Sequence, residues 1–87
     1  MQRRDKLDII QAILEALAKE KLVRTKLIYA SYLSNNQFAD YSEKLIEKGL
    51  ICEKKKGNTT EYSITDNGRK YLEKLKAMKE MTKAFQL

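Results

Sequence analysis

Residues 33–51, which read LSNNQFADYSEKLIEKGLI, carry the signals for both the beginning and the end of one helix. Ser34 and Gln37 fit the S-x-x-Q capping box, in which the hydroxyl accepts from the N3 amide and the glutamine reaches back to the cap. Gly49 stands where a left-handed residue ends a helix. The stretch therefore predicts a helix over 35–48. Its buried face is formed by Phe38, Tyr41, Leu45 and Ile46.

Two further helices are predicted before this one. Thr25 is a candidate cap for a short helix over 25–33, and almost nothing separates that helix from the next. Such a close succession of short helices is typical of a helix-turn-helix. The first helix is predicted over 5–20, with Asp5 as its cap. Its apolar residues Leu7, Ile10, Leu14 and Leu17 follow 3-4-3 spacing. Residues 22–24 form a candidate short strand.

After Gly49 the hydrophobic period changes from helix to strand. Residues 51–64 predict a hairpin that turns at Gly57-Asn58. Cys52 is interpreted as a small core residue of this hairpin rather than a reactive thiol. Thr65 then caps a last helix over 65–83. The fold class is therefore mostly α with a β-hairpin, a winged helix-turn-helix (α-α-α-β-β-α) with an extended C-terminal helix.

Composition excludes several classes of function. The 87 residues contain no histidine and one cysteine, so they cannot form a Ser-His-Asp or Cys-His catalytic site, a histidine-based metal site or an intrachain disulfide. We expect the protein not to be an enzyme, and to have no metal and no cofactor. Lys and Arg number 18 against 12 Asp and Glu, which gives a net charge of +6. This excess favours a polyanionic partner.

The composite pattern resembles a family of small archaeal winged-helix DNA-binding proteins, which includes chromatin proteins and transcription regulators. The resemblance covers about residues 5–75. The matching residues are Thr25, Leu33-Ser34, Phe38, Tyr41, Gly49-Leu50-Ile51 and the Tyr62-Ser63-Ile64-Thr65-Asp66-Asn67-Gly68 run. Ser42 departs from the pattern, since the family favours leucine there. The resemblance implies a homodimer held by the C-terminal helix and bound to DNA.

The predicted DNA-binding residues lie on three segments. They are Arg24, Lys26, Ser34, Asn35, Asn36, Gln37, Asp40, Lys44, Lys54, Lys55 and Lys56. Helix 35–48 would enter the major groove, with amides suited to adenine edges, while lysines beside the hairpin tip contact phosphates. Two alternatives stay open: an ordinary solvated helix face, and lysines that protect a strand edge from aggregation. Residues 3, 4 and 6 (Arg, Arg, Lys) form either a second basic arm or a solvated helix start.

An apolar seam runs along the last helix. Tyr71, Leu75, Met78, Thr82 and Phe85 recur at 4-3-4-3 spacing, with Leu72 and Met81 beside them. The first part of the seam can cover the domain's own core, but the last part extends past it. We therefore divide the chain into a winged helix-turn-helix domain over 1–70 and a continuous dimerisation helix over 71–87. The dimerisation residues are Tyr71, Leu75, Met78, Met81, Thr82 and Phe85.

These features lead to one function and one alternative. The first is double-stranded DNA binding by a homodimer that is either chromatin-associated or a transcription regulator. The alternative is a winged-helix protein–protein interaction module in a larger assembly, favoured by the carboxylates of Asp40, Glu43 and Glu47 on the third helix. No apolar stretch is long enough for a transmembrane helix, so no membrane association is expected. We expect a cytoplasmic, nucleoid-associated protein, and the sequence indicates no small-molecule ligand.

Overall fold

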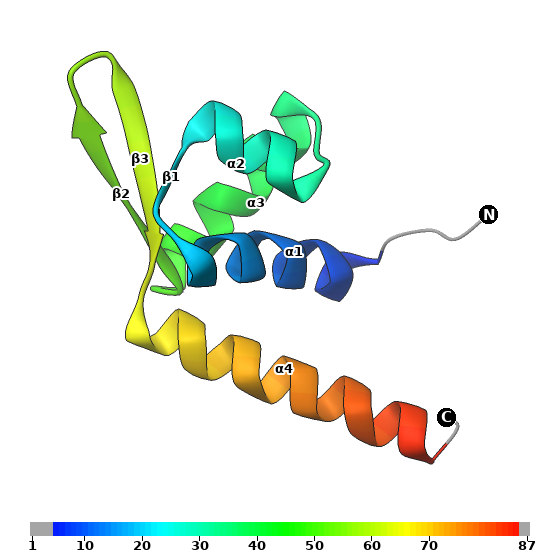
Figure 1. The fold of residues 1–87 in the computed structure, drawn as a ribbon. Coiled ribbons are helices and arrows are strands. Elements are labelled where there is room, and N and C mark those ends of the chain that lie inside the picture. Colours follow the sequence, from blue (N-terminus) through cyan, green and yellow to red (C-terminus); the bar gives the residue numbers. More distant parts are fainter. Residues whose placement is uncertain (1–4, 86–87) are drawn as a thin grey trace.

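Four helices and three strands follow one another in the order expected from the sequence (Figure 1). The computed structural model describes residues 5–85, so Arg3 and Arg4 of the candidate basic arm lie outside the described residues. The elements are α1 (Lys6–Lys19), β1 (Leu22–Val23), α2 (Arg24–Ser31), α3 (Asn35–Glu47), β2 (Ile51–Lys56), β3 (Thr59–Ile64) and α4 (Asp66–Ala84). The predicted winged helix-turn-helix is confirmed, and no predicted helix end differs by more than two residues.

Strand β3 lies at the centre of a three-stranded antiparallel sheet, between β1 and β2. The chain turns between β2 and β3 at Gly57-Asn58, as predicted, with Lys56 opposite Thr59. Gly57 has a φ of +61°, the conformation that a two-residue hairpin turn with glycine in first place requires. We call residues 51–64 the wing; they project beyond the helices (Figure 1).

The core is built around Phe38, whose side chain is fully buried. Its ring meets Tyr62 edge-on, with 5.3 Å between ring centroids and 89° between ring planes. The surrounding side chains Ile13, Leu14, Leu27 and Ile51 come from α1, α2 and β2 and are also buried. Phe38 therefore joins α3 to the wing and to both preceding helices.

Three of the four predicted caps form as expected, and α2 differs. Asp5 and Ser34 each accept from the N3 amide of their helix within a capping box. Thr25, predicted to cap α2, lies inside the helix instead, because α2 begins at Arg24 with no side-chain cap bond. The physical reason is that β1 leads directly into α2. Val23 still pairs with Glu61 in the sheet and leaves no loop in which a cap could form.

The wing places Cys52 on its outer side, so the prediction of a core residue is wrong. Ile51 lies opposite Ile64 and is 1% exposed, and successive strand residues point to opposite faces. Cys52 therefore faces away from the core and is exposed. Its Sγ lies 3.0 Å from the Ser63 Oγ across the sheet.

The tyrosines divide into two groups by their exposure. Tyr62 is buried and Tyr41 and Tyr71 are half-buried, but Tyr29 and Tyr32 on α2 are 81% and 84% exposed. Tyr32 also ends α2 with a φ of +56°, in the left-handed region that glycine or asparagine usually occupies. The turn between α2 and α3 therefore has a bulky residue at a position that costs it backbone energy.

A compact joint fixes the start of α4 to the end of α3. The Thr65 N–H donates to the Leu50 carbonyl at 3.1 Å, and the Thr65 hydroxyl donates to the Gly49 carbonyl at 2.6 Å. That hydroxyl also accepts from the Gly68 N–H at 3.0 Å, which confirms Thr65 as the cap. Gly49 has a φ of +74° and directly follows Lys48, the C-cap residue of α3, as predicted. Gly68 is buried against this joint.

Helix α4 packs alongside α1 and runs in the opposite direction (Figure 1). Leu72 and Leu75 are buried in this contact. Two ion pairs extend it toward the C-terminus: Lys76 lies 3.7 Å from Glu15, and the Lys79 ammonium bonds to Asp8. The hydrogen bond from Lys79 and the backbone amide of Asp5 hold the pKa of Asp8 below its ordinary value of 3.8.

This lowered pKa predicts an acid-sensitive contact between α1 and α4. A depressed carboxyl pKa contributes stability above the unfolded value, and that contribution is lost as pH falls through the folded value. We expect Lys79→Met to be less stable than the wild type at pH 7 and equally stable well below pH 3.8. Urea unfolding at a series of pH values measures the difference. A difference that persists unchanged in strong acid would show that the Lys79 stem, not the ion pair, stabilises the contact.

Candidate nucleic-acid interface

Three of the predicted DNA-contacting segments lie toward one end of the molecule. The tip of the wing, the beginning of α2 and the beginning of α3 all lie away from α4 (Figure 1). Helix beginnings present backbone N–H groups and the positive end of the helix dipole. This end therefore combines two positive helix ends with the lysines of the wing.

Helix α3 presents amides in its first turn and carboxylates further along. Asn35 and Asn36 are exposed in that turn. The side-chain oxygens of Ser34 and Gln37 are engaged in the capping box, each accepting a backbone N–H at 3.1 Å. These two residues therefore fix the beginning of the helix.

The carboxylates of α3 are fully available to solvent. Asp40, Glu43 and Glu47 are all exposed. Because they follow the first turn, negative charge begins where the amides end. On the side of α3 that carries these carboxylates, only the beginning of the helix is electrostatically suited to a polyanion.

Arg24 has a structural contact that the sequence did not indicate. Its guanidinium carbon lies 5.0 Å from the centroid of the Phe38 ring, and its side chain is half-buried. A guanidinium over an aromatic face is attracted by the ring quadrupole. Arg24 therefore ties the beginning of α2 to the core aromatic of α3, whereas Lys26, two residues on, is exposed.

The three wing lysines do not all point the same way. Lys54 and Lys56 lie on the outer face with Cys52, while Lys55 shares the other face with Glu53 and Tyr62, as the strand register requires. Lys56 lies 3.4 Å from Glu61 across the sheet. All three lysines are exposed, so the wing tip presents positive charge on both faces.

Lys44 lies apart from the other predicted DNA-binding residues. It lines a cavity between α1, α3 and α4, together with Lys6 and Lys48. The other predicted residues come from the beginning of α2, from residues 34–40 at and after the beginning of α3, and from the wing. Lys44, one turn after Asp40, is therefore the furthest of them along α3, and the sequence pattern did not indicate the cavity that it lines.

The predicted dimerisation residues separate into a packed half and an exposed half. Leu75 is buried against the domain and Tyr71 is half-buried. Beyond them Met78, Met81 and Phe85 are 49%, 62% and 69% exposed. Thr82 is exposed as well. We call Met78, Met81 and Phe85 the apolar stripe of α4.

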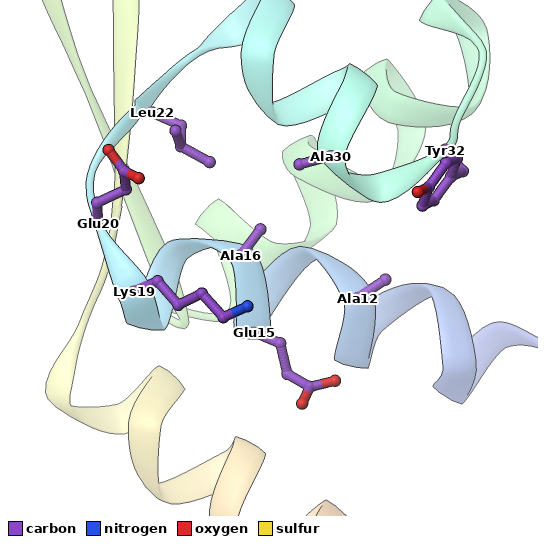
Figure 2. Close-up of a pocket in the computed structure, with 8 residues that line it drawn as sticks. All are labelled: Ala12, Glu15, Ala16, Lys19, Glu20, Leu22, Ala30 and Tyr32. Atoms are coloured by element: carbon purple, nitrogen blue, oxygen red, sulfur yellow. The ribbon is translucent and has the colours of Figure 1, made fainter.

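A second hollow lies between α1 and α2 (Figure 2). Its volume is about 660 Å³, with Ala16, Ala30 and Leu22 inside and charged side chains at the edge (Figure 2). Across residues 5–85 no group of three or more His, Cys, Asp or Glu side chains is placed to hold a metal ion. Nor does any helix within that range have the length and apolarity needed to span a membrane.

Comparison with known proteins agrees with this geometry. A sequence model of the winged helix-turn-helix family matches residues 3–83. No curated protein matches the chain. Among solved structures, it is similar to Sso10a-2, a DNA-binding protein from Sulfolobus solfataricus, with a TM-score of 0.86 and 19% identity, covering 95% of this chain and 86% of that one.

Two transcription regulators are also similar in structure. For the PcaV transcriptional regulator from Streptomyces coelicolor the TM-score is 0.80 at 22% identity, covering 88% of this chain and 60% of that one. For the MarR family transcriptional regulator SPO1453 from Silicibacter pomeroyi it is 0.68 at 15% identity, covering 93% and 59%. At these identities the likeness shows a shared fold, and the regulators have further segments that this chain does not cover.

Proposed function

This chain belongs to the winged helix-turn-helix family, and from that premise we propose that it binds double-stranded DNA as a homodimer, in chromatin or as a transcription regulator. The resemblance to small archaeal winged-helix proteins is confirmed by the family match and by the likeness to Sso10a-2. The observation that supports DNA binding best is the gathering of exposed wing lysines and two helix beginnings at one end of the molecule. A nucleoid-associated location and a non-enzymatic role go with this proposal.

In the proposed complex only the first turn of α3 enters the major groove deeply. The amides of Asn35 and Asn36 suit the donor and acceptor pair on an adenine edge. The exposed carboxylates of Asp40 and Glu43 repel phosphates and oppose deeper insertion. Few base contacts follow from this geometry, so sequence selectivity is weak.

The phosphate backbone supplies most of the affinity. Lys26 at the beginning of α2 and the lysines of the wing contact phosphates on either side of the groove. The Ser34 hydroxyl and the first amides of α3 face a phosphate at the helix end. Arg24 contributes chiefly by holding α2 on Phe38, since its guanidinium already lies over that ring.

Titration of the full chain into random duplex DNA at several salt concentrations tests the proposal. Each phosphate that a lysine neutralises contributes about −0.9 to the slope of log affinity against log salt. We expect micromolar or tighter binding at low salt, a steep slope, and similar affinity for unrelated sequences. Absence of binding at micromolar protein and low salt would reject DNA binding.

That negative result would favour the second candidate, an interaction module in a larger assembly. The supporting observation is the exposed carboxylate face of α3, formed by Asp40, Glu43 and Glu47. In that case the partner is a basic protein surface, and high salt weakens its binding as well. The DNA titration therefore distinguishes the two candidate functions, because only the first requires binding to duplex DNA.

Dimerisation is proposed from the apolar stripe of α4. Tyr71, Met78 and Phe85 are seven residues apart, so they stay on one face of the helix. Fully burying a large apolar side chain contributes about 1.5–3 kcal/mol. A second copy of α4 provides that burial, and the division into a domain over 1–70 and a dimerisation helix over 71–87 is part of this proposal.

Lysine substitution in the stripe tests the dimer. We expect Met78→Lys with Phe85→Lys to raise the dimer dissociation constant by at least about 10³-fold, because four apolar side chains per dimer, which are 49% and 69% exposed in one copy, lose the burial that the partner adds. Sedimentation equilibrium at micromolar concentration measures the constant. Glu73→Gln with Glu80→Gln is the matched control, since both glutamates are exposed and the charge changes equally. A monomeric wild type, or a double lysine variant that dimerises as well as the control, would remove the dimer.

A further inference from the structure

A cavity of about 350 Å³ lies between α1, α3 and α4, with an apolar wall. Ile10 and Leu45 form part of this wall and belong to the core, with 8% and 3% of their side chains exposed. Leu50, half-buried at the entrance to the wing, adds to it. Ile10 and Leu45 therefore form a buried floor, and the apolar surface still open above it comes from Leu50 and from the half-buried rings of Tyr41 and Tyr71.

Three lysines from two helices surround the same cavity. Lys6 comes from the beginning of α1, Lys44 from α3, and Lys48 is the C-cap residue of α3, four positions after Lys44. No carboxylate lines the cavity. The ion pairs found within residues 5–85 involve Lys56, Lys76 and Lys79, so none of the three cavity lysines is neutralised there.

The three lysines carry the same charge and repel one another across the cavity. Like charges four residues apart, such as those of Lys44 and Lys48, are unfavourable on a helix surface. Lys6 adds a third positive charge at the same cavity. An anion bound between the three ammonium groups would attract each of them and so offset their mutual repulsion. The half-buried tyrosines Tyr41 and Tyr71 also line the cavity and bring phenol hydroxyls that can donate to an anion.

We propose that this cavity binds a medium-chain fatty carboxylate. The carboxylate lies among the ammonium groups of Lys6, Lys44 and Lys48, and the acyl chain covers Leu50 and the rings of Tyr41 and Tyr71 above the floor of Ile10 and Leu45. An extended chain suits the surface better than a compact ring. Tyr71 also lines a neighbouring hollow of about 220 Å³ with Leu7, Lys74 and Leu75, and the remaining lining residue, Met78, packs against the partner in the proposed dimer.

Titration of the full chain with sodium decanoate, followed by calorimetry and by amide and tyrosine NMR shifts, tests the site. No DNA is present, so the result is independent of the proposed function. The neutral analogue 1-decanol has the same chain, and acetate has only the carboxylate. We expect decanoate to bind at least about tenfold more tightly than decanol, the size of one charge-assisted hydrogen bond, and acetate not to bind at millimolar concentration.

Charge variants locate the carboxylate. Lys44→Gln with Lys48→Gln should weaken decanoate binding by about tenfold and leave decanol binding unchanged. Lys54→Gln with Lys55→Gln makes the same change of charge on the exposed wing and should leave decanoate binding unchanged. Equal affinity for decanoate and decanol, equal weakening by both double variants, shifts confined to the apolar stripe of α4, or no binding at all would each overturn the proposal.

Discussion

Replacing Gly68 by alanine should destabilise the protein by about 3 kcal/mol or more, although alanine normally stabilises a helix interior by about 1 kcal/mol. A Cβ on Gly68 would lie 2.0 Å from the Leu50 carbonyl oxygen and 2.7 Å from Ile64 Cγ1. Neither atom can move independently. The Leu50 carbonyl accepts from the Thr65 N–H at 3.1 Å, so displacing it opens the joint that positions α4.

Thermal unfolding measures this loss. For a chain of this size, 3 kcal/mol corresponds to a fall in Tm of about 12–24 °C. Asn67→Ala is the matched control, because Asn67 is exposed in the same first turn of α4 and its substitution should change Tm little. If Gly68→Ala were as stable as that control, or more stable, α4 would not approach Leu50 as closely as the structure shows.

The helix boundaries could be predicted because their signals are local. The capping box of Ser34 and Gln37 and the left-handed Gly49 depend on neighbouring residues alone. Thr65 was likewise identified as a cap from its position before the last helix. The reason for the glycine three residues later is not local, since its close contact is with Leu50, eighteen positions earlier in the chain.

The predictions made from the sequence were wrong or incomplete where contacts between distant segments determine how a residue is placed. Cys52 follows two apolar residues, so no alternation along the strand indicates its direction. The pairing of Ile51 with Ile64 turns it outward. Thr25 looks like a cap until β1 is known to pair through Val23. The contact of Arg24 with Phe38 joins residues fourteen positions apart and leaves no spacing signal.

The sequence predicted which segments contribute to the candidate site, but not which of their side chains lie together in the fold. Helical angles place Lys44 beside Tyr41, yet only the packing of α1 and α4 shows that this side of α3 faces Lys6 and Tyr71. The wing lysines form a run in the sequence, while the strand register distributes them over two faces. The sequence shows which segments are positively charged, but only the folded structure shows which way their lysine side chains point.

The second large effect concerns those wing lysines. Replacing Lys54, Lys55 and Lys56 together with alanine should lower the affinity for every duplex tested by about 100-fold at 0.1 M salt, and should flatten the salt slope by between two and three for each wing bound. The loss is smaller than three full phosphate contacts predict, because Lys56 already lies 3.4 Å from Glu61 and must exchange that partner for a phosphate.

Two further variants separate phosphate contact from general charge and from a role in protecting the strand edge. Arg69, Lys70 and Lys83 are exposed on α4, away from the wing tip, and their triple alanine variant changes the net charge equally. It should reduce affinity far less. Glu61→Gln removes the carboxylate that competes for Lys56, so it should raise DNA affinity and steepen the slope. If the wing lysines serve only to keep strand edges apart, their substitution will leave the slope unchanged, and Glu61→Gln will act no differently from any other lost negative charge.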